Sequence, residues 1–187
     1  MNNAFSTAQL GIDGLTLCHV AHTPGGSGAG GTQNNRPMDS TGVIANVDLS
    51  DTALQIMETD VAGWTDDNGV PKAVMVKKLV IAQRNRPLAT QLLMSPQMPT
   101  TANRSINPFH KDYGPDLQLV VWPSYLTDAD AWFGVTDCMD GLQFFWRNSW
   151  ELAQENDFDT KGKKYSIWGR FGVGFTDWRG IYGCPGQ

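Results

Sequence analysis

Apolar and polar residues alternate most regularly in the last third of the chain. One face of an extended segment is formed by Leu142, Phe144, Trp146, Trp150 and Leu152. A second segment presents Tyr165, Ile167, Phe171, Val173 and Phe175 in the same way. This alternation is typical of β-strands that bury one face. Because the polar stretch 153–164 between them contains the turn signal Lys161-Gly162, we predict a long hairpin with an exposed, charged tip.

Helical spacing appears in the middle of the chain. Apolar residues recur at helical intervals at Leu49, Ala53, Met57, Val61 and Trp64. Ser50 or Asp48 can cap the start, so the pattern predicts a helix over 49–64. A second predicted helix begins at Arg86-Pro87, where proline fits the first turn, and ends at about Met94.

Short apolar runs beside these helices predict the strands of a sheet. The clearest runs are 73–82, 117–122 and 131–136, which are rich in β-branched and aromatic residues. We expect the last two to pair with each other across a turn at 127–130. A further short strand is expected at 15–20. Helices and strands together predict an α+β fold around one sheet.

Composition narrows the function classes. The 187 residues carry a net charge of −5 without a long run of Lys or Arg, which argues against sequence-specific nucleic-acid binding. The 3 cysteines lack C-x-x-C spacing, so we expect a reducing compartment and no disulfide framework. No apolar run approaches the roughly 18 to 20 residues that a membrane span needs. We therefore expect a protein made in the cytoplasm, without a membrane partner.

Candidate metal chemistry is confined to one short segment. Cys18, His19 and His22 lie close enough in sequence to share a divalent ion, although their spacing matches no familiar zinc pattern. A fourth ligand would have to come from His110, Cys138 or Cys184. The simpler interpretation is a buried cysteine beside surface histidines. The glycine-rich stretch 24–31 lacks the lysine of a phosphate-binding loop, so we expect no cofactor there.

The sequence supports an enzymatic function even less than it supports a metal site. No Ser or Cys nucleophile stands in a recognisable motif with a histidine. The many tryptophans leave one alternative, a carbohydrate-binding or glycoside-hydrolysing β-rich module. That alternative requires Trp132, Trp146 and Trp168 to line an open groove with two carboxylates about 5 to 10 Å apart. Because the tryptophans alternate on strand faces, we expect core positions instead, and no enzyme.

A series of short motifs recurs in a characteristic order along the chain. In that order they are NAF (3–5), LTLCHVAH (15–22), NRP (35–37), KKLVIA (77–82), INP (106–108), YLTDADAWFGVTD (125–137), GLQFFWR, ENDFDT and GFTDWRGIYG. In this order and spacing the chain, from residue 2 to 183, resembles the C-terminal portion of Mu-like tailed-phage major head subunits. These are major capsid proteins.

The resemblance implies the Hong Kong 97 capsid fold, in which an axial domain with a mixed sheet and flanking helices carries a peripheral β-hairpin. Residues 1–140 would be mainly axial domain, with 1–9 at the end of the spine helix. Residues 141–170 would form the peripheral hairpin belt, and 171–187 would return to the axial domain. Most of the N-terminal arm, extended loop and spine helix would precede Asn2. We therefore expect a fragment or a truncated product.

The resemblance also implies a function: a structural subunit, or fragment, of a tailed-bacteriophage or prophage icosahedral capsid around the viral DNA. Its partners would be copies of itself in hexamers and pentamers, with scaffold, maturation protease and decoration proteins, and its final location the virion. A charged hairpin tip suits contacts between like neighbours. The candidate subunit contacts are Glu155, Asp157, Asp159, Lys161, Lys163 and Lys164.

Overall fold

Two helices begin and end close to where the sequence pattern places them. The computed structural model describes residues 10–11, 13–23, 31–38, 46–98, 105–110, 117–124, 126 and 128–186. Helix α1 spans Asp51–Ala62, and its start is capped by Ser50, whose Oγ accepts a hydrogen bond from the Ala53 N–H at 3.2 Å. Helix α2 spans Arg86–Met94 after a short 3₁₀ turn, with Pro87 in its first turn. Both predicted helices are confirmed.

The central sheet contains strands β1 (Val76–Ala82), β2 (Gln118–Trp122), β3 (Trp132–Thr136) and β6 (Ile181–Cys184). Their order is β2-β1-β3-β6, with β1 parallel to β2 and antiparallel to β3, so the sheet is mixed. The prediction that β2 and β3 pair with each other is wrong, because β1 lies between them. Apart from Lys77 and Lys78, strand β1 is apolar and buried, which favours the central position.

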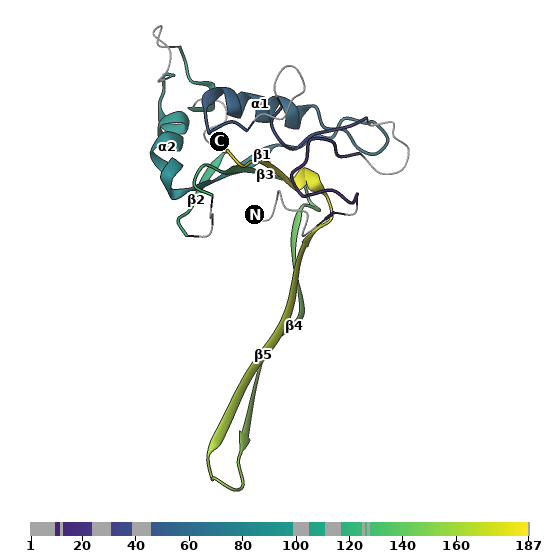
Figure 1. The fold of residues 1–187 in the computed structure, drawn as a ribbon, viewed down its shortest axis with the longest axis vertical. Helices are drawn as coiled ribbons and strands as arrows, with labels where there is room; N and C mark the ends of the chain where they lie inside the picture. The colour runs from purple at the N-terminus through teal and green to yellow at the C-terminus, as the bar shows by residue number, and fades with distance from the viewer. Residues whose placement is uncertain are drawn as a thin grey trace.

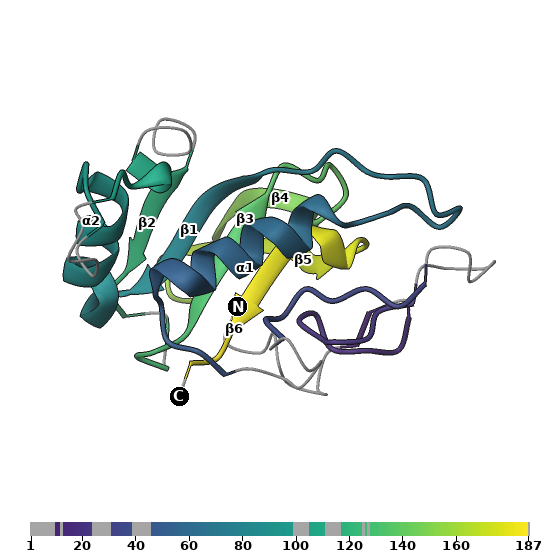
Figure 2. The same cartoon turned by 90° about the horizontal axis from the view of Figure 1, so that it is seen from above.

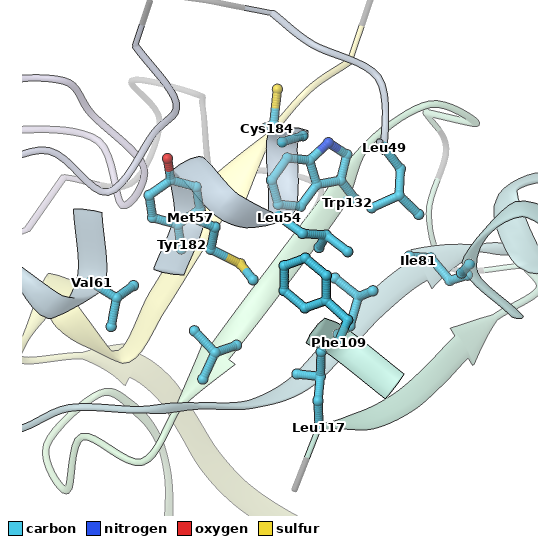
Figure 3. Close-up of a cluster of buried hydrophobic side chains, with 14 of the residues drawn as sticks. Leu49, Leu54, Met57, Val61, Ile81, Phe109, Leu117, Trp132, Tyr182 and Cys184 are labelled. Atoms are coloured by element: carbon cyan, nitrogen blue, oxygen red, sulfur yellow. The ribbon is translucent and has the colours of Figure 1, made fainter. Parts of the chain in front are cut away.

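Each face of the sheet has its own apolar cover. Figures 1 and 2 show α1 lying across one face, while α2 flanks the β2 end. Leu54 and Met57 of α1 belong to the same buried cluster as Trp132 and Tyr182 (Figure 3). On the other face a second cluster is formed by Leu17, Cys18, Val80, Ala82, Leu126, Ala131, Phe133 and Ile181. Among the described residues, the N-terminal segment around Leu17 and Cys18 covers that face, and no helix does.

The segment 15–20 covers the sheet without being a strand. Its backbone makes only an isolated bridge between Thr16 and Leu10, so the expected short strand is wrong. Its apolar positions instead direct Leu17 and Cys18 into the second cluster. Burial explains the apolar pattern here without extended pairing.

No helix in the described part of the chain combines the length and hydropathy that crossing a membrane requires.

Candidate functional site

We call the central sheet with α1 and α2 the sheet domain. A long hairpin projects from it (Figure 1). It consists of β4 (Leu142–Asn156) and β5 (Lys163–Phe175), which pair antiparallel from Leu142 opposite Phe175 to Asn156 opposite Lys163. The predicted hairpin is confirmed, although its strands run further toward the tip than the apolar alternation does. An irregularity in the pairing lies between Trp146 and Glu151.

One face of this hairpin is apolar along most of its length. Residues directly opposite each other in an antiparallel pair share a face, so the register joins Phe144 with Val173, Trp146 with Phe171, and Leu152 with Ile167. We call this the apolar face; its exposed members are Leu142, Phe144, Trp146, Trp150, Leu152, Tyr165, Ile167, Phe171 and Val173. The alternation predicted from the sequence is therefore present in the structure.

The prediction that this face is buried is wrong for the single chain. Its side chains are between 47% and 69% exposed. No second layer of the described residues covers the hairpin, because all described helices pack on the sheet domain. Ring contacts at centroid distances of 5.2 to 5.8 Å connect the aromatic residues Phe144, Trp146, Trp150 and Phe171. These rings shield one another partly from water while remaining outside the core.

The tryptophans divide between two environments. Trp132 and Trp178 are buried in the sheet domain, as the core interpretation expects. Trp146, Trp150 and Trp168 are exposed on the hairpin, where that interpretation is wrong. Since Trp132 is fully buried, it lines no open groove with Trp146 and Trp168. The arrangement required for a glycoside hydrolase is not present among these residues.

Charged side chains at the hairpin tip form a local network around Asp157. Its carboxylate accepts from Lys164 Nζ at 2.8 Å and from Thr160 Oγ1 at 2.9 Å. The bond from Lys164, followed by that from Thr160, lowers the pKa of Asp157. Lys161 has a left-handed backbone, with φ of 55°, and its Nζ lies 4.6 Å from the Phe158 ring centroid.

The other candidate contact residues form fewer interactions within the hairpin. Glu155 lies opposite Lys164 in the register, and Lys163 lies opposite Asn156. Within the described residues, Glu155, Asp159 and Lys163 take part in no ion pair. The structure thus brings all six predicted contact residues to one end of the hairpin, where Asp157 and Lys164 pair with each other.

The root of the hairpin is held by charge and by close backbone packing. Asp177 accepts from Lys72 Nζ at 2.9 Å and from Arg179 Nη1 at 3.2 Å. Burial would raise the pKa of Asp177, but bonds from the Arg179 N–H and from Lys72 outweigh it, so the pKa is lowered. A Cβ built on Gly180 would lie 2.3 Å from the Gly141 Cα, so the two backbones meet where only glycine fits.

A buried hydrogen-bond network around Asn35, which we call the buried node, lies in the N-terminal segment beside this root. Asn35 is fully buried, and its amide donates to the carbonyls of Leu17, Trp178 and Ile181 at 2.7, 3.1 and 2.9 Å. Its Oδ1 accepts from the His19 N–H at 2.8 Å. Asn35 thereby fastens the N-terminal segment to the end of the chain. The only sequence signal for it was its place in the motif NRP.

His22 belongs to the same node. It is fully buried, so the expectation of surface histidines is wrong at this position. Its Nδ1 lies 2.5 Å from Asp13 Oδ2, and its ring stacks on Trp178 at a centroid distance of 4.5 Å. Burial lowers the pKa of His22, against the raising effect of Asp13. The neutral imidazole therefore serves packing and hydrogen bonding.

The candidate metal ligands do not form a site. Cys18 is buried in the apolar cluster beside Phe133 and Ile181, and burial strongly raises the pKa of its thiol. In the ranges that the structure describes, no three His, Cys, Asp or Glu side chains converge in a way that could hold an ion. Cys18 and Cys184 are both buried, and none of the 3 cysteines forms a disulfide. The simpler interpretation of a buried cysteine is thus confirmed for Cys18.

Comparison with known proteins agrees with a structural role. Residues 19–183 match a family model described as phage capsid protein. A phage-related protein from Bordetella bronchiseptica RB50 shares 11% identity with this chain at a TM-score of 0.43, with 73% of this chain and 47% of that chain covered. The chain thus spans less than half the length of that protein. No curated protein matches significantly. Since the family match extends over most of the sequence, this chain belongs to the phage capsid protein family.

Proposed function

We propose that this chain is a structural subunit, or part of one, of the icosahedral capsid of a tailed bacteriophage or prophage, with the Hong Kong 97 fold. Family membership supports a capsid role and assembly with copies of itself. The mixed sheet with α1 and α2 would be the axial domain, comprising 1–140 and 171–187. The hairpin of 141–170 would be the peripheral domain.

The observation that carries this proposal is the exposed apolar face of the hairpin. Soluble monomers rarely expose a contiguous apolar surface of this extent, and such surfaces mark sites of association. Burying one large apolar side chain contributes about 1.5 to 3 kcal/mol. A neighbour that covers even part of this face would therefore stabilise the assembly substantially. A shell subunit would use such an arm to reach its neighbours.

The charged tip supplies orientation within that association. Acidic and basic side chains occupy the same end of the hairpin, and charges at the rim of an interface give register and association rate more than affinity. We propose Glu155, Asp157, Asp159, Lys161, Lys163 and Lys164 as subunit contacts. In hexamers and pentamers the acidic side of one tip would face the basic side of the next. Such rings would assemble in the host cytoplasm, and scaffold, protease and decoration proteins would act on them there.

The test is particle formation by the full-length gene product. Electron microscopy at low salt should show closed shells for the unchanged protein. Replacing Lys161, Lys163 and Lys164 together with Glu should lower the particle yield, while the thermal unfolding of the subunit changes little because the tip is exposed. Lys78→Glu, on the exposed surface of the sheet domain, is the control and should leave the yield normal.

Two results would count against the proposal. Normal yield from the triple variant would remove the tip from the subunit contacts. A full-length protein that remains monomeric at all concentrations and salts would contradict the capsid function itself.

A further inference from the structure

The hairpin has two free edges. It forms a sheet of β4 and β5 alone, and nothing in the described part of the chain pairs with the outer side of either strand. The strands are 15 and 13 residues long. Long exposed edges are templates for pairing with another chain, and proteins usually shorten or cover them. Neither protection is present in the described part of the chain, so the edges themselves are candidates for an interface.

The register indicates which backbone groups point outward. The Asp157 N–H donates to the Gly162 carbonyl at 2.9 Å across the tip. In an antiparallel pair, residues alternate between those bonded to the partner strand and those directed away from it. Counting from this bond, the N–H and C=O groups of Gln154 on β4 and Tyr165 on β5 point away from the hairpin. Between the tip and the irregularity at Trp146 to Glu151, each edge therefore presents outward-pointing donors and acceptors at every second residue.

Charge is divided between the two strands. Strand β5 carries Lys163, Lys164 and Arg170 and no acidic residue. Strand β4 carries Glu151 and Glu155 with a single Arg147. Pairing β5 with another β5 would bring bases together, and pairing β4 with β4 would oppose mainly acids. Only β4 against β5 joins opposite charges.

We propose that the β4 edge of one copy pairs with the β5 edge of the next copy, with both hairpins pointing the same way. In that orientation β4 runs antiparallel to the neighbour's β5, as it does to its own. The contact uses different surfaces on the two copies, so it repeats around a ring. It also joins the apolar faces of successive hairpins into one broad surface. The inference rests on the proposed function, which supplies the second copy as the partner.

Charge variants that spare contacts within one hairpin test the pairing. Glu151 lies opposite Trp168, Lys163 opposite Asn156, and Arg170 opposite Asn148, so reversing these charges breaks no cross-strand ion pair in the same chain. Variant one is Glu151→Lys, which leaves Glu155 as the single acidic residue of β4 and so makes both strands net basic. Variant two combines Lys163→Glu with Arg170→Glu, which leaves Lys164 as the single basic residue of β5 and so makes both strands net acidic.

Sedimentation of the complete protein at low salt measures the result. Each variant alone should self-associate about tenfold more weakly than the unchanged protein, because the two pairing strands then carry net charges of the same sign. A mixture of equal amounts should recover association, because basic and acidic edges then alternate. Failure of the mixture to recover would overturn the charge-guided pairing of β4 with β5.

The backbone provides an independent test. Gln154→Pro removes an outward N–H without removing a bond inside the hairpin, whereas Gln154→Ala keeps that N–H. The proline variant should lose association while its circular dichroism matches that of the alanine control. In the assembled unchanged protein, the amides of Gln154 and Tyr165 should exchange more slowly than in the monomer.

The outcomes separate this inference from the proposed function. Closed shells in which the Gln154 and Tyr165 amides exchange as fast as in the monomer would refute the edge pairing and leave the capsid function standing. A protein that never associates, with both amides freely exchanging, would contradict both.

Discussion

Replacing Asn35 with alanine should destabilise the sheet domain more than any change on the hairpin. The Asn35 amide donates to the carbonyls of Leu17, Trp178 and Ile181, and its oxygen accepts from a backbone N–H. These partners belong to the N-terminal segment and to the last residues of the chain. The node is buried, so water cannot replace the lost bonds without entering the core.

The expected loss of unfolding free energy follows from the number of buried groups that lose their hydrogen bond to Asn35. An unsatisfied buried donor or acceptor costs about 1 to 3 kcal/mol. The two amide hydrogens of Asn35 are shared by three carbonyls, of which that of Trp178 keeps its bond from the Ile181 N–H, and the Asn35 oxygen accepts from one N–H. Because the site also relaxes partly, we expect a loss of about 3 to 5 kcal/mol. For a domain of this size that corresponds to a fall in melting temperature of roughly 6 to 20 °C.

Urea and thermal unfolding, followed by circular dichroism, would measure this loss. Asn35→Asp keeps the acceptor and removes the donors, so it should also destabilise strongly. Asn156→Ala, at an exposed hairpin position, is the matched control and should change the unfolding free energy by less than about 0.5 kcal/mol. If Asn35→Ala unfolds within about 1 kcal/mol of the unchanged protein, the node does not hold the two segments together.

Two further predictions concern the same region. Burial lowers the pKa of His22 below its unfolded value of 6.5, so the unfolded chain binds the proton first as the pH falls. The stability that is present above about pH 6.5 should therefore fall as the pH drops through the folded pKa. His22→Gln should reduce this pH dependence of the unfolding free energy, measured by urea titrations at several pH values. Gly180→Ala places a Cβ 2.3 Å from the Gly141 Cα and should lower the melting temperature. Gly172→Ala, with no atom within 4 Å of its Cβ, is the control and should not lower it. Equal melting temperatures for the two variants would show that the backbones at the hairpin root can move apart without loss of stability.

Local patterns predicted the elements well where the signal lies within one segment. The spacing of Met57 and Val61, with Ser50 as cap, defines α1 without knowledge of the rest of the chain. Pro87 marks the start of α2 for a reason that is equally local. Alternation placed the residues of the hairpin on their correct faces, and the turn signal at Lys161 lies inside the observed turn.

Long-range arrangement required information that these patterns lack. The pairing of β2 with β3 was inferred from their closeness in sequence, but β1 separates them because its apolar side chains are buried on both faces. The burial of His22 depends on Trp178, which is distant in sequence and stacks on its ring. The role of Asn35 depends likewise on carbonyls near the end of the chain. No window of the sequence contains both partners.

The hairpin shows a different limit of prediction from sequence. The alternation correctly predicted an apolar face, but the prediction that this face is buried within the chain was wrong. Alternation reports that one face is apolar, but it does not report which molecule covers that face. A two-stranded sheet is marginally stable in water unless a third element packs on it, and the described residues provide none. Selection for this pattern within a single chain would make little physical sense, since the exposed rings gain only their contacts with each other. The apolar face is explained if its cover lies outside the described residues, and in a capsid family a neighbouring copy is present at every position of the shell.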